Sequence, residues 1–214
     1  NGEYPSADIY YAGRSLPFSK EKIEFPVNVL ITPNDPRIIG DLKKWNLYQT
    51  GEDPETLIPK IYRKIFENYY QYEYDKNVWG VDECWELVAE LFAKYKTGKI
   101  KADCDSFSVL MKSYYLAAGV PDWRVRCVAG TCSLGGHLTV YCYSKKSKKW
   151  KHLNSTYGGS IYDTLSEYPT HQDARDGKDK IGITTTWFSF GYIKSWSTFD
   201  TAGQIKELKR FKFK

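Results

Sequence analysis

The stretch KADCDSFSVLMKSYYLAAGV, residues 101–120, predicts a helix that begins at a cysteine. Asp103 is a favourable N-cap residue, and Gly119 followed by Pro121 would end the helix. Apolar residues recur between them at helical spacing and form one buried face: Phe107, Leu110, Met111, Tyr114 and Ala118. Cys104 is therefore expected in the first turn, on the side that the helix packs against its neighbours.

A thiol in the first turn of a helix is well placed for nucleophilic chemistry. The unpaired N–H groups and the dipole of the helix favour an anion there, and the thiolate is the reactive form of cysteine. Asp103 and Asp105 oppose this effect because they repel a thiolate. The pattern therefore requires a cationic partner, for which histidine is the usual choice.

The periodicity of the chain changes after this helix. Two helices are expected before it, one after Asp53 with the stripe Leu57, Ile61, Ile65 and Tyr69, and one over Asp82–Tyr95. Strands are expected after it, in DWRVRCVAG with Trp123, Val125, Cys127 and Ala129 on one face, then in HLTVYCY, KWKHLN and GITTTWFSFGYIKSWSTF. Helices followed by consecutive strands predict an α+β fold with an antiparallel sheet.

The chain is long enough for one substantial core, which we assign to residues 56–200. Residues 1–55 read as an irregular arm or wrapping segment that holds at most a short strand, because three prolines interrupt it: Pro26, Pro33 and Pro36. Residues 201–214 read as a basic tail.

Of the three histidines, His137 is the best candidate to partner Cys104. It begins the strand HLTVYCY after the glycine-containing segment GTCSLGG, so a rigid backbone would carry it beside an open space. His152 lies mid-strand near the lysine-rich turn, and His171 lies in a polar loop.

Asn154 is the candidate to orient the His137 ring. If residues 137–143 and 149–154 form a hairpin about the turn 144–148, paired residue numbers sum to about 291–292 and bring His137 opposite 154–155. A group that holds the second ring nitrogen would complete a nucleophile–base–orienter set.

These residues lie in segments that resemble the core of the transglutaminase-like superfamily: KADCDSFSVLMKSYYLAAGVPDWRVRCVAG, GGHLTVYCY and KWKHLNST. The upstream YEYDKNVWGVDECWELVAELFAKYKTG is similar to the lead-in of bacterial transglutaminase-like cysteine proteinases, so the resemblance spans about residues 60–156. It implies a papain-like α+β fold, with Cys104 as nucleophile, His137 as general base and acid, and Asn154 as orienter. The chain departs from the family pattern at Ala102, where glycine is common, and at Asn154, where aspartate is usual.

The resulting prediction is acyl transfer on an amide bond of a peptide or protein, with no cofactor. Hydrolysis is favoured over transfer to an amine, since nothing in the chain resembles the accessory domains or calcium sites of animal transglutaminases. The Cys104 N–H and a second donor would hold the oxyanion, and Gln71 is a candidate for that donor.

Two other classes of function stay open at this stage. One is a non-catalytic module of the same fold that binds a peptide or glycan. The other is a zinc site, since a cysteine or histidine recurs every fifth residue at Cys127, Cys132, His137 and Cys142. The spacing is not that of a zinc knuckle, and His137 and Cys142 would point to opposite faces of one strand.

Composition excludes further classes. No apolar run is long enough to span a membrane. The net charge of +5 is partly concentrated in SKKSKKWK (144–151) and KELKRFKFK (206–214), which we interpret as a solvated hairpin tip and tail rather than a nucleic-acid patch. Five cysteines, an odd number without a disulfide-scaffold pattern, favour reduced thiols and a reducing compartment.

Overall fold

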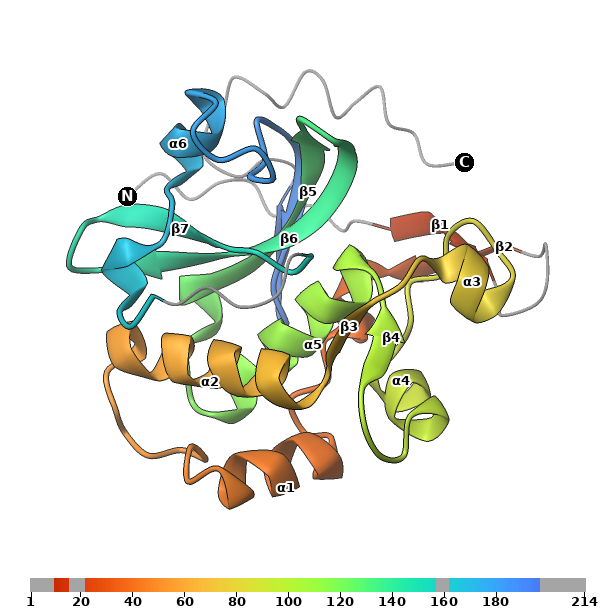
Figure 1. Ribbon diagram of the computed structural model, residues 1–214, viewed down its shortest axis with the longest axis horizontal. Coiled ribbons are helices and arrows are strands. Elements are labelled where there is room, and N and C mark those ends of the chain that lie inside the picture. The colour runs from red at the N-terminus through yellow and green to blue at the C-terminus, as the bar shows by residue number, and fades with distance from the viewer. Residues whose placement is uncertain (1–9, 16–21, 157–161, 197–214) are drawn as a thin grey trace.

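A central helix, α5, lies between an antiparallel sheet and a layer of further helices (Figure 1). The computed structural model describes residues 10–15, 22–156 and 162–196. The helices are α1 (Pro36–Lys44), α2 (Pro54–Asn68), α3 (Asp75–Trp79), α4 (Val88–Lys94), α5 (Cys104–Ala117) and α6 (His171–Arg175). Short 3-10 helices lie at Val27–Leu30, Asp122–Arg124 and Leu165–Glu167.

The main sheet has five strands in the order β7-β6-β5-β8-β9, and every neighbouring pair is antiparallel. Its strands are β5 (Val125–Cys132), β6 (Gly135–Ser144), β7 (Lys149–Leu153), β8 (Thr185–Phe190) and β9 (Ser195–Trp196). Two smaller sheets pair β1 (Tyr10–Ser15) with β2 (Lys22–Pro26), antiparallel, and β3 (Tyr70–Tyr72) with β4 (Ile100–Ala102), parallel. The predicted α+β fold with an antiparallel sheet is confirmed.

Helix α5 forms for the reasons that its sequence indicates. The Asp103 carboxylate accepts a hydrogen bond from the Asp105 N–H as N-cap, and Gly119 has a φ of +96° just beyond the last turn. The predicted buried face is confirmed, and most other side chains of the helix are buried as well, because the sheet covers one side and α1, α2 and α4 contact the other. The helix is therefore the centre of the core.

The stripe predicted on α2 is also confirmed, since Leu57, Ile61, Ile65 and Tyr69 are all buried. The prediction that residues 1–55 are irregular does not hold for residues 36–44, which form a helix. Helix α1 begins after the N-cap Asp35, buries Ile38 and Leu42, and packs on α5. Pro36 begins this helix rather than breaking a strand, because proline is tolerated in a first turn where its missing N–H has no partner to lose.

The prediction of a helix over Asp82–Tyr95 is wrong for the first half of that range. Residues 82–87 are irregular, and helix α4 begins at Val88. The physical reason is local: the Asp75 carboxylate accepts the Cys84 N–H, and Glu86 turns inward to accept from the Trp79 indole N–H. These side-chain hydrogen bonds hold residues 82–87 in a loop, in competition with the backbone hydrogen bonds that a helix would form there.

Trp123 is a second correction. It lies in the 3-10 turn Asp122–Arg124 before β5 and is 48% exposed, so it does not share the buried face of Val125, Cys127 and Ala129. The predicted tail 201–214 lies outside the described residues, and the proposed division at 55/56 and 200/201 stays a prediction. No helix in the described part of the chain is long and apolar enough to cross a membrane.

Candidate functional site

The thiol of Cys104 lies at the junction of helix α5 and strand β6. The backbone N–H of Leu138 acts to lower the pKa of the thiol and so favours its ionised form. One helical turn further on, the Ser108 hydroxyl contacts the carbonyl oxygens of Cys104 (2.6 Å) and Leu138 (3.0 Å), which fastens the start of the helix to the strand. Cys104 is partly exposed, whereas the side chains that follow it are buried.

His137 adjoins Leu138 at the start of β6 and is 9% exposed. Nε2 of its ring lies 3.4 Å from the Thr156 hydroxyl. Burial, and to a smaller extent the nearby His152, lower the pKa of His137 while Asp179 opposes them, and the resulting pKa is about 3. The ring is therefore neutral at physiological pH and able to accept a proton.

Asn154 follows the end of β7 and forms hydrogen bonds with Thr156 and Tyr62. Its carboxamide oxygen accepts the Thr156 N–H at 2.8 Å, and its carbonyl oxygen accepts the Tyr62 hydroxyl at 2.7 Å. Paired residues of β6 and β7 sum to 293, as in Val140 with Leu153 and Tyr141 with His152. The predicted sum of 291–292 is wrong by one to two residues, and the observed register directs His137 toward Thr156.

The electrostatic environment opposes a preformed thiolate–imidazolium pair. Burial and then the Asp103 carboxylate raise the pKa of Cys104, with smaller contributions from Glu83 and Asp75. Since the pKa of His137 is lowered, both groups are neutral together. Burial, together with the repulsion expected from Asp103, thus outweighs the favourable effect of the Leu138 N–H.

Asp75, Asp103 and Asp105 form an acidic cluster around the first turn of α5. Each offers one carboxylate oxygen, and these oxygens lie within 4.8 Å of one another. Burial and then Asp103 raise the pKa of Asp75 to about 8, and the same two causes raise that of Asp105. One oxygen of Asp75 and one of Asp105 are buried without a hydrogen-bond partner.

These properties fit a hard divalent cation. Ca²⁺ binds carboxylate oxygens at about 2.3–2.6 Å, so two ligands of one ion lie at most about 5 Å apart. A cation would also satisfy the two partnerless oxygens and offset the Asp103 charge that contributes to the raised pKa of Asp75 and Asp105. The sequence did not point to these three aspartates as metal ligands, so this cluster is a feature that sequence reasoning missed.

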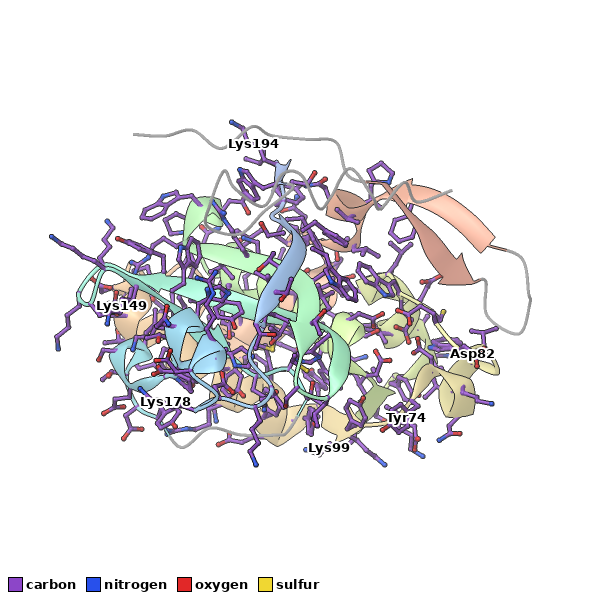
Figure 2. The ribbon with its side chains drawn as sticks, turned by 90° about the horizontal axis from the view of Figure 1, so that it is seen from above. Tyr74, Asp82, Lys99, Lys149, Lys178 and Lys194 are labelled. Carbon is purple, nitrogen blue, oxygen red and sulfur yellow. The ribbon has the colours of Figure 1, made fainter. Side chains whose placement is uncertain are left out.

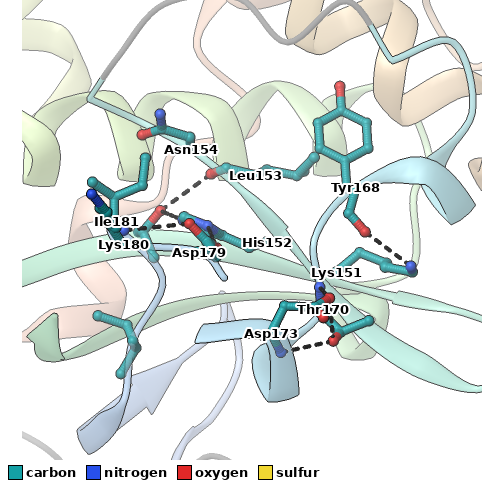
Figure 3. A network of polar contacts seen from close by, with 12 residues as sticks. Lys151, His152, Leu153, Asn154, Tyr168, Thr170, Asp173, Asp179, Lys180 and Ile181 are labelled. Carbon is teal, nitrogen blue, oxygen red and sulfur yellow. Dashed lines mark hydrogen bonds and ion pairs between the residues drawn. The ribbon is translucent and has the colours of Figure 1, made fainter. Parts of the chain in front are cut away.

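His152 belongs to a second buried polar group beneath the site. Its Nδ1 lies 2.7 Å from the Asp179 carboxylate and its Nε2 lies 2.9 Å from the Thr139 hydroxyl, as Figure 3 shows for His152 and Asp179. The Ser155 hydroxyl donates to the carbonyl of Leu138 at 3.1 Å. This group supports the strand segment that carries His137.

The other predicted site residues are distributed as follows. Gln71 is exposed on β3, paired with Lys101 on the strand β4 that leads into Asp103, and its role as oxyanion donor stays a prediction. The five cysteines are free. Within the described ranges, the acidic cluster is the sole gathering of three or more potential metal ligands, so the alternative zinc site at Cys127, Cys132, His137 and Cys142 does not form.

Three residues of this site were not singled out from the sequence: Thr156, Asp75 and Asp179. Thr156 carried a weak signal, since it closes the segment HLNST next to Asn154. Asp75 and Asp179 carried none, because they are remote in the chain from Cys104 and His137 and only the fold brings them near.

The solved structures that this chain resembles include Legionella pneumophila LapG and EGTA-treated LapG. Each has a TM-score of 0.52 at 16% sequence identity, over 84% of this chain and 97% of the LapG chain. At this identity the likeness shows the fold, which is papain/transglutaminase-like. No family model and no curated protein matches the chain.

Proposed function

We propose that this protein is a cysteine hydrolase that cleaves amide bonds in peptide or protein substrates, with Cys104 as nucleophile and His137 as general base and acid. The observation that carries the proposal is the Ser108 hydroxyl, which contacts the carbonyl oxygens of both Cys104 and Leu138. His137 adjoins Leu138 on the same strand, so the contact ties the neighbourhood of the base to the start of the nucleophile helix. The papain/transglutaminase-like fold supports the same chemistry.

The reaction has two steps. Neutral His137 takes the thiol proton as the sulfur attacks the carbonyl carbon, and the resulting imidazolium gives that proton to the amine nitrogen, which leaves as the thioester forms. Water then attacks the thioester, His137 takes its proton, and the carboxylic acid is released with the thiol restored. Because the two groups start neutral, proton transfer accompanies attack rather than preceding it.

Thr156 and Asn154 act on the orientation of the base. If Nε2 donates to the Thr156 hydroxyl, Nδ1 is the nitrogen left to serve the thiol. Asn154 bonds the Thr156 N–H and so supports this arrangement from behind. In this proposal Asn154 keeps its predicted role as orienter, exercised through Thr156.

The acidic cluster supports a regulatory contribution by a divalent cation such as Ca²⁺. Asp75, Asp103 and Asp105 would hold the ion, and its charge would favour the ionised form of the adjacent Cys104 thiol. The chain's own residues perform each bond-making and bond-breaking step.

A second candidate function is a non-catalytic binding module of the same fold. The raised pKa of Cys104 favours it, since a thiol that does not ionise is a poor nucleophile. Transfer of the acyl group to an amine instead of water is a further outcome that the same site would allow.

The test combines thiol reactivity with turnover. Iodoacetamide modification is followed by mass spectrometry in wild type, His137→Ala and a control Cys132→Ala, with EDTA or with CaCl2. A panel of peptide, isopeptide and peptidoglycan-type amides is assayed with wild type and Cys104→Ala. We expect Cys104 to react fastest, its advantage to vanish in His137→Ala, and hydrolysis to vanish in Cys104→Ala. Equal reactivity of all five cysteines in both buffers, with no amide cleaved, would favour the binding module.

A further inference from the structure

The turn between β6 and β7 carries a concentrated positive charge that the proposed chemistry does not use. Four of its residues, here called the lysine turn, are exposed: Lys145, Lys146, Lys148 and Lys149. Among the residues that the structure describes, none of the four side-chain ammonium groups forms an ion pair with a carboxylate. Like charges at this spacing repel, so an acidic partner would relieve the turn.

The lysine turn is held in one conformation from below. The Glu55 carboxylate, in the first turn of α2, accepts from the Lys145 N–H at 2.7 Å, the Ser144 hydroxyl at 3.0 Å and Arg124 Nη2 at 2.7 Å. Lys148 has a φ of +56°, a left-handed conformation that glycine adopts more readily. The turn thus carries a lysine at a position where the backbone conformation favours glycine, which has no side chain.

An exposed aromatic ring stands beside the lysine turn. Trp123 is 48% exposed, with Lys145 Nζ 5.6 Å from its ring centroid and the Tyr143 ring 6.1 Å away. The ring is therefore fixed next to the lysines with much of its apolar surface open to solvent. Together they offer several ammonium groups and one apolar contact.

We propose that the lysine turn and Trp123 form a docking site for an acidic segment of a protein partner that also carries an apolar residue. Glutamate and aspartate side chains would match the lysines, and the apolar residue would cover the tryptophan. A nucleic acid fits less well. Single strands need a basic groove with several stacking rings, and Arg124, which could bind phosphate bidentately, is buried and engaged by Glu55 and the Tyr143 carbonyl.

The docking site is remote from Cys104 and His137. Strand β6 runs from the His137 end to the turn, and a strand rises about 3.3 Å per residue, so the eight residue steps from His137 to Lys145 span at most roughly 26 Å. Figure 2 shows Lys149 projecting at one side of the molecule, with Asp82 at the other. A partner bound here would leave the candidate active site open, and the inference does not depend on the proposed hydrolysis.

The test measures binding of a defined probe to the full chain. The probe is a fluorescein-labelled peptide of eight glutamates with a central leucine, followed by fluorescence anisotropy at low and at physiological salt. The test variant is Lys146→Glu/Lys148→Glu/Lys149→Glu. Its matched control, Lys43→Glu/Lys44→Glu/Lys96→Glu, makes the same change in net charge at exposed lysines elsewhere.

We expect the lysine-turn variant to weaken binding at least tenfold, and the control to stay within about twofold of wild type. Trp123→Ala should weaken binding of the leucine-containing peptide but not of a peptide of glutamates alone. Equal losses of peptide affinity in the two triple variants would show that net charge alone accounts for binding, and would overturn the proposal. Tighter binding of a 12-nucleotide single strand than of the peptide, or no binding of the peptide by wild type, would also overturn it.

Discussion

The Thr156 hydroxyl lies 3.4 Å from Nε2 of His137, across the ends of strands β6 and β7. The two residues meet because the register of that pair sums to 293, and 137 with 156 gives the same sum. The Thr156 hydroxyl thus contacts one ring nitrogen of the proposed base. The contact leads directly to a test of how the base is oriented.

Thr156→Val removes this hydroxyl and keeps the shape of the side chain. We expect kcat to fall about tenfold, the cost of one hydrogen bond to a positioned group, with KM little changed. Thr156→Ser should restore kcat, because serine supplies the same oxygen. Steady-state kinetics on the amide that the panel identifies checks both variants, and equal rates for valine and serine would remove Thr156 from the mechanism.

Asp103→Asn separates the charge of the N-cap from its capping role. Asparagine caps a helix as well as aspartate does, so α5 should stay intact. The pKa of Cys104 should fall because its largest repelling charge is gone. In EDTA at pH 9 we expect alkylation of Cys104 to quicken roughly threefold or more. Asp53→Asn, at the N-cap of α2, is the control, and no change in Asp103→Asn would contradict the electrostatic account.

Asp75→Asn tests the acidic cluster through stability. The folded protein holds the Asp75 proton up to a pKa of about 8, against 3.8 for an unperturbed carboxyl. It therefore binds more protons than the unfolded chain between about pH 4 and pH 8, and its stability falls as pH rises across that window. In EDTA at pH 8.5 we expect Asp75→Asn to be more stable than wild type by on the order of 2 kcal/mol, with little difference at pH 4.

Calcium should reverse this ranking. Wild type should gain Tm on addition of CaCl2, and Asp75→Asn should gain much less, because the variant lacks one ligand. Thermal unfolding at both pH values checks the prediction, with the exposed Asp163→Asn as control. If Asp75→Asn is less stable than wild type at pH 8.5 in EDTA, burial and the Asp103 charge do not destabilise the ionised form of Asp75.

Gly130→Ala tests the packing beneath His137, its partner across β5 and β6. A Cβ at Gly130 would lie 2.3 Å from the Thr185 carbonyl oxygen, so strand β8 would have to move, and we expect a loss of about 2–3 kcal/mol in stability. Gly40→Ala, within α1, meets nothing within 4 Å and should stabilise by about 0.5–1 kcal/mol. Chemical denaturation checks the opposite signs, and the same sign for both would contradict the steric argument.

The parts of the fold that follow from local pattern were predictable. Helix α5 has its cap, apolar face and terminator within 20 consecutive residues, and the segment that forms β5 has apolar residues at period 2. The segment 82–87 was mispredicted because its periodicity fits a helix, whereas the Cys84 N–H donates to the side chain of Asp75 from another part of the chain. Trp123 was mispredicted because it lies in a 3-10 turn ahead of β5 rather than in the strand.

The sequence by itself determined where Cys104 stands, at the start of a helix, and that helices would pack against an antiparallel sheet, because capping and periodicity act over a few residues. Only the tertiary structure decided that Ser108 joins Cys104 to Leu138, that Thr156 faces His137, and that three aspartates gather at the first turn of α5. Those contacts depend on strand register and on loop paths between distant segments. A shift of one residue in strand register would bring different side chains to the site. The local pattern of the sequence would be the same in both registers, so it does not distinguish them.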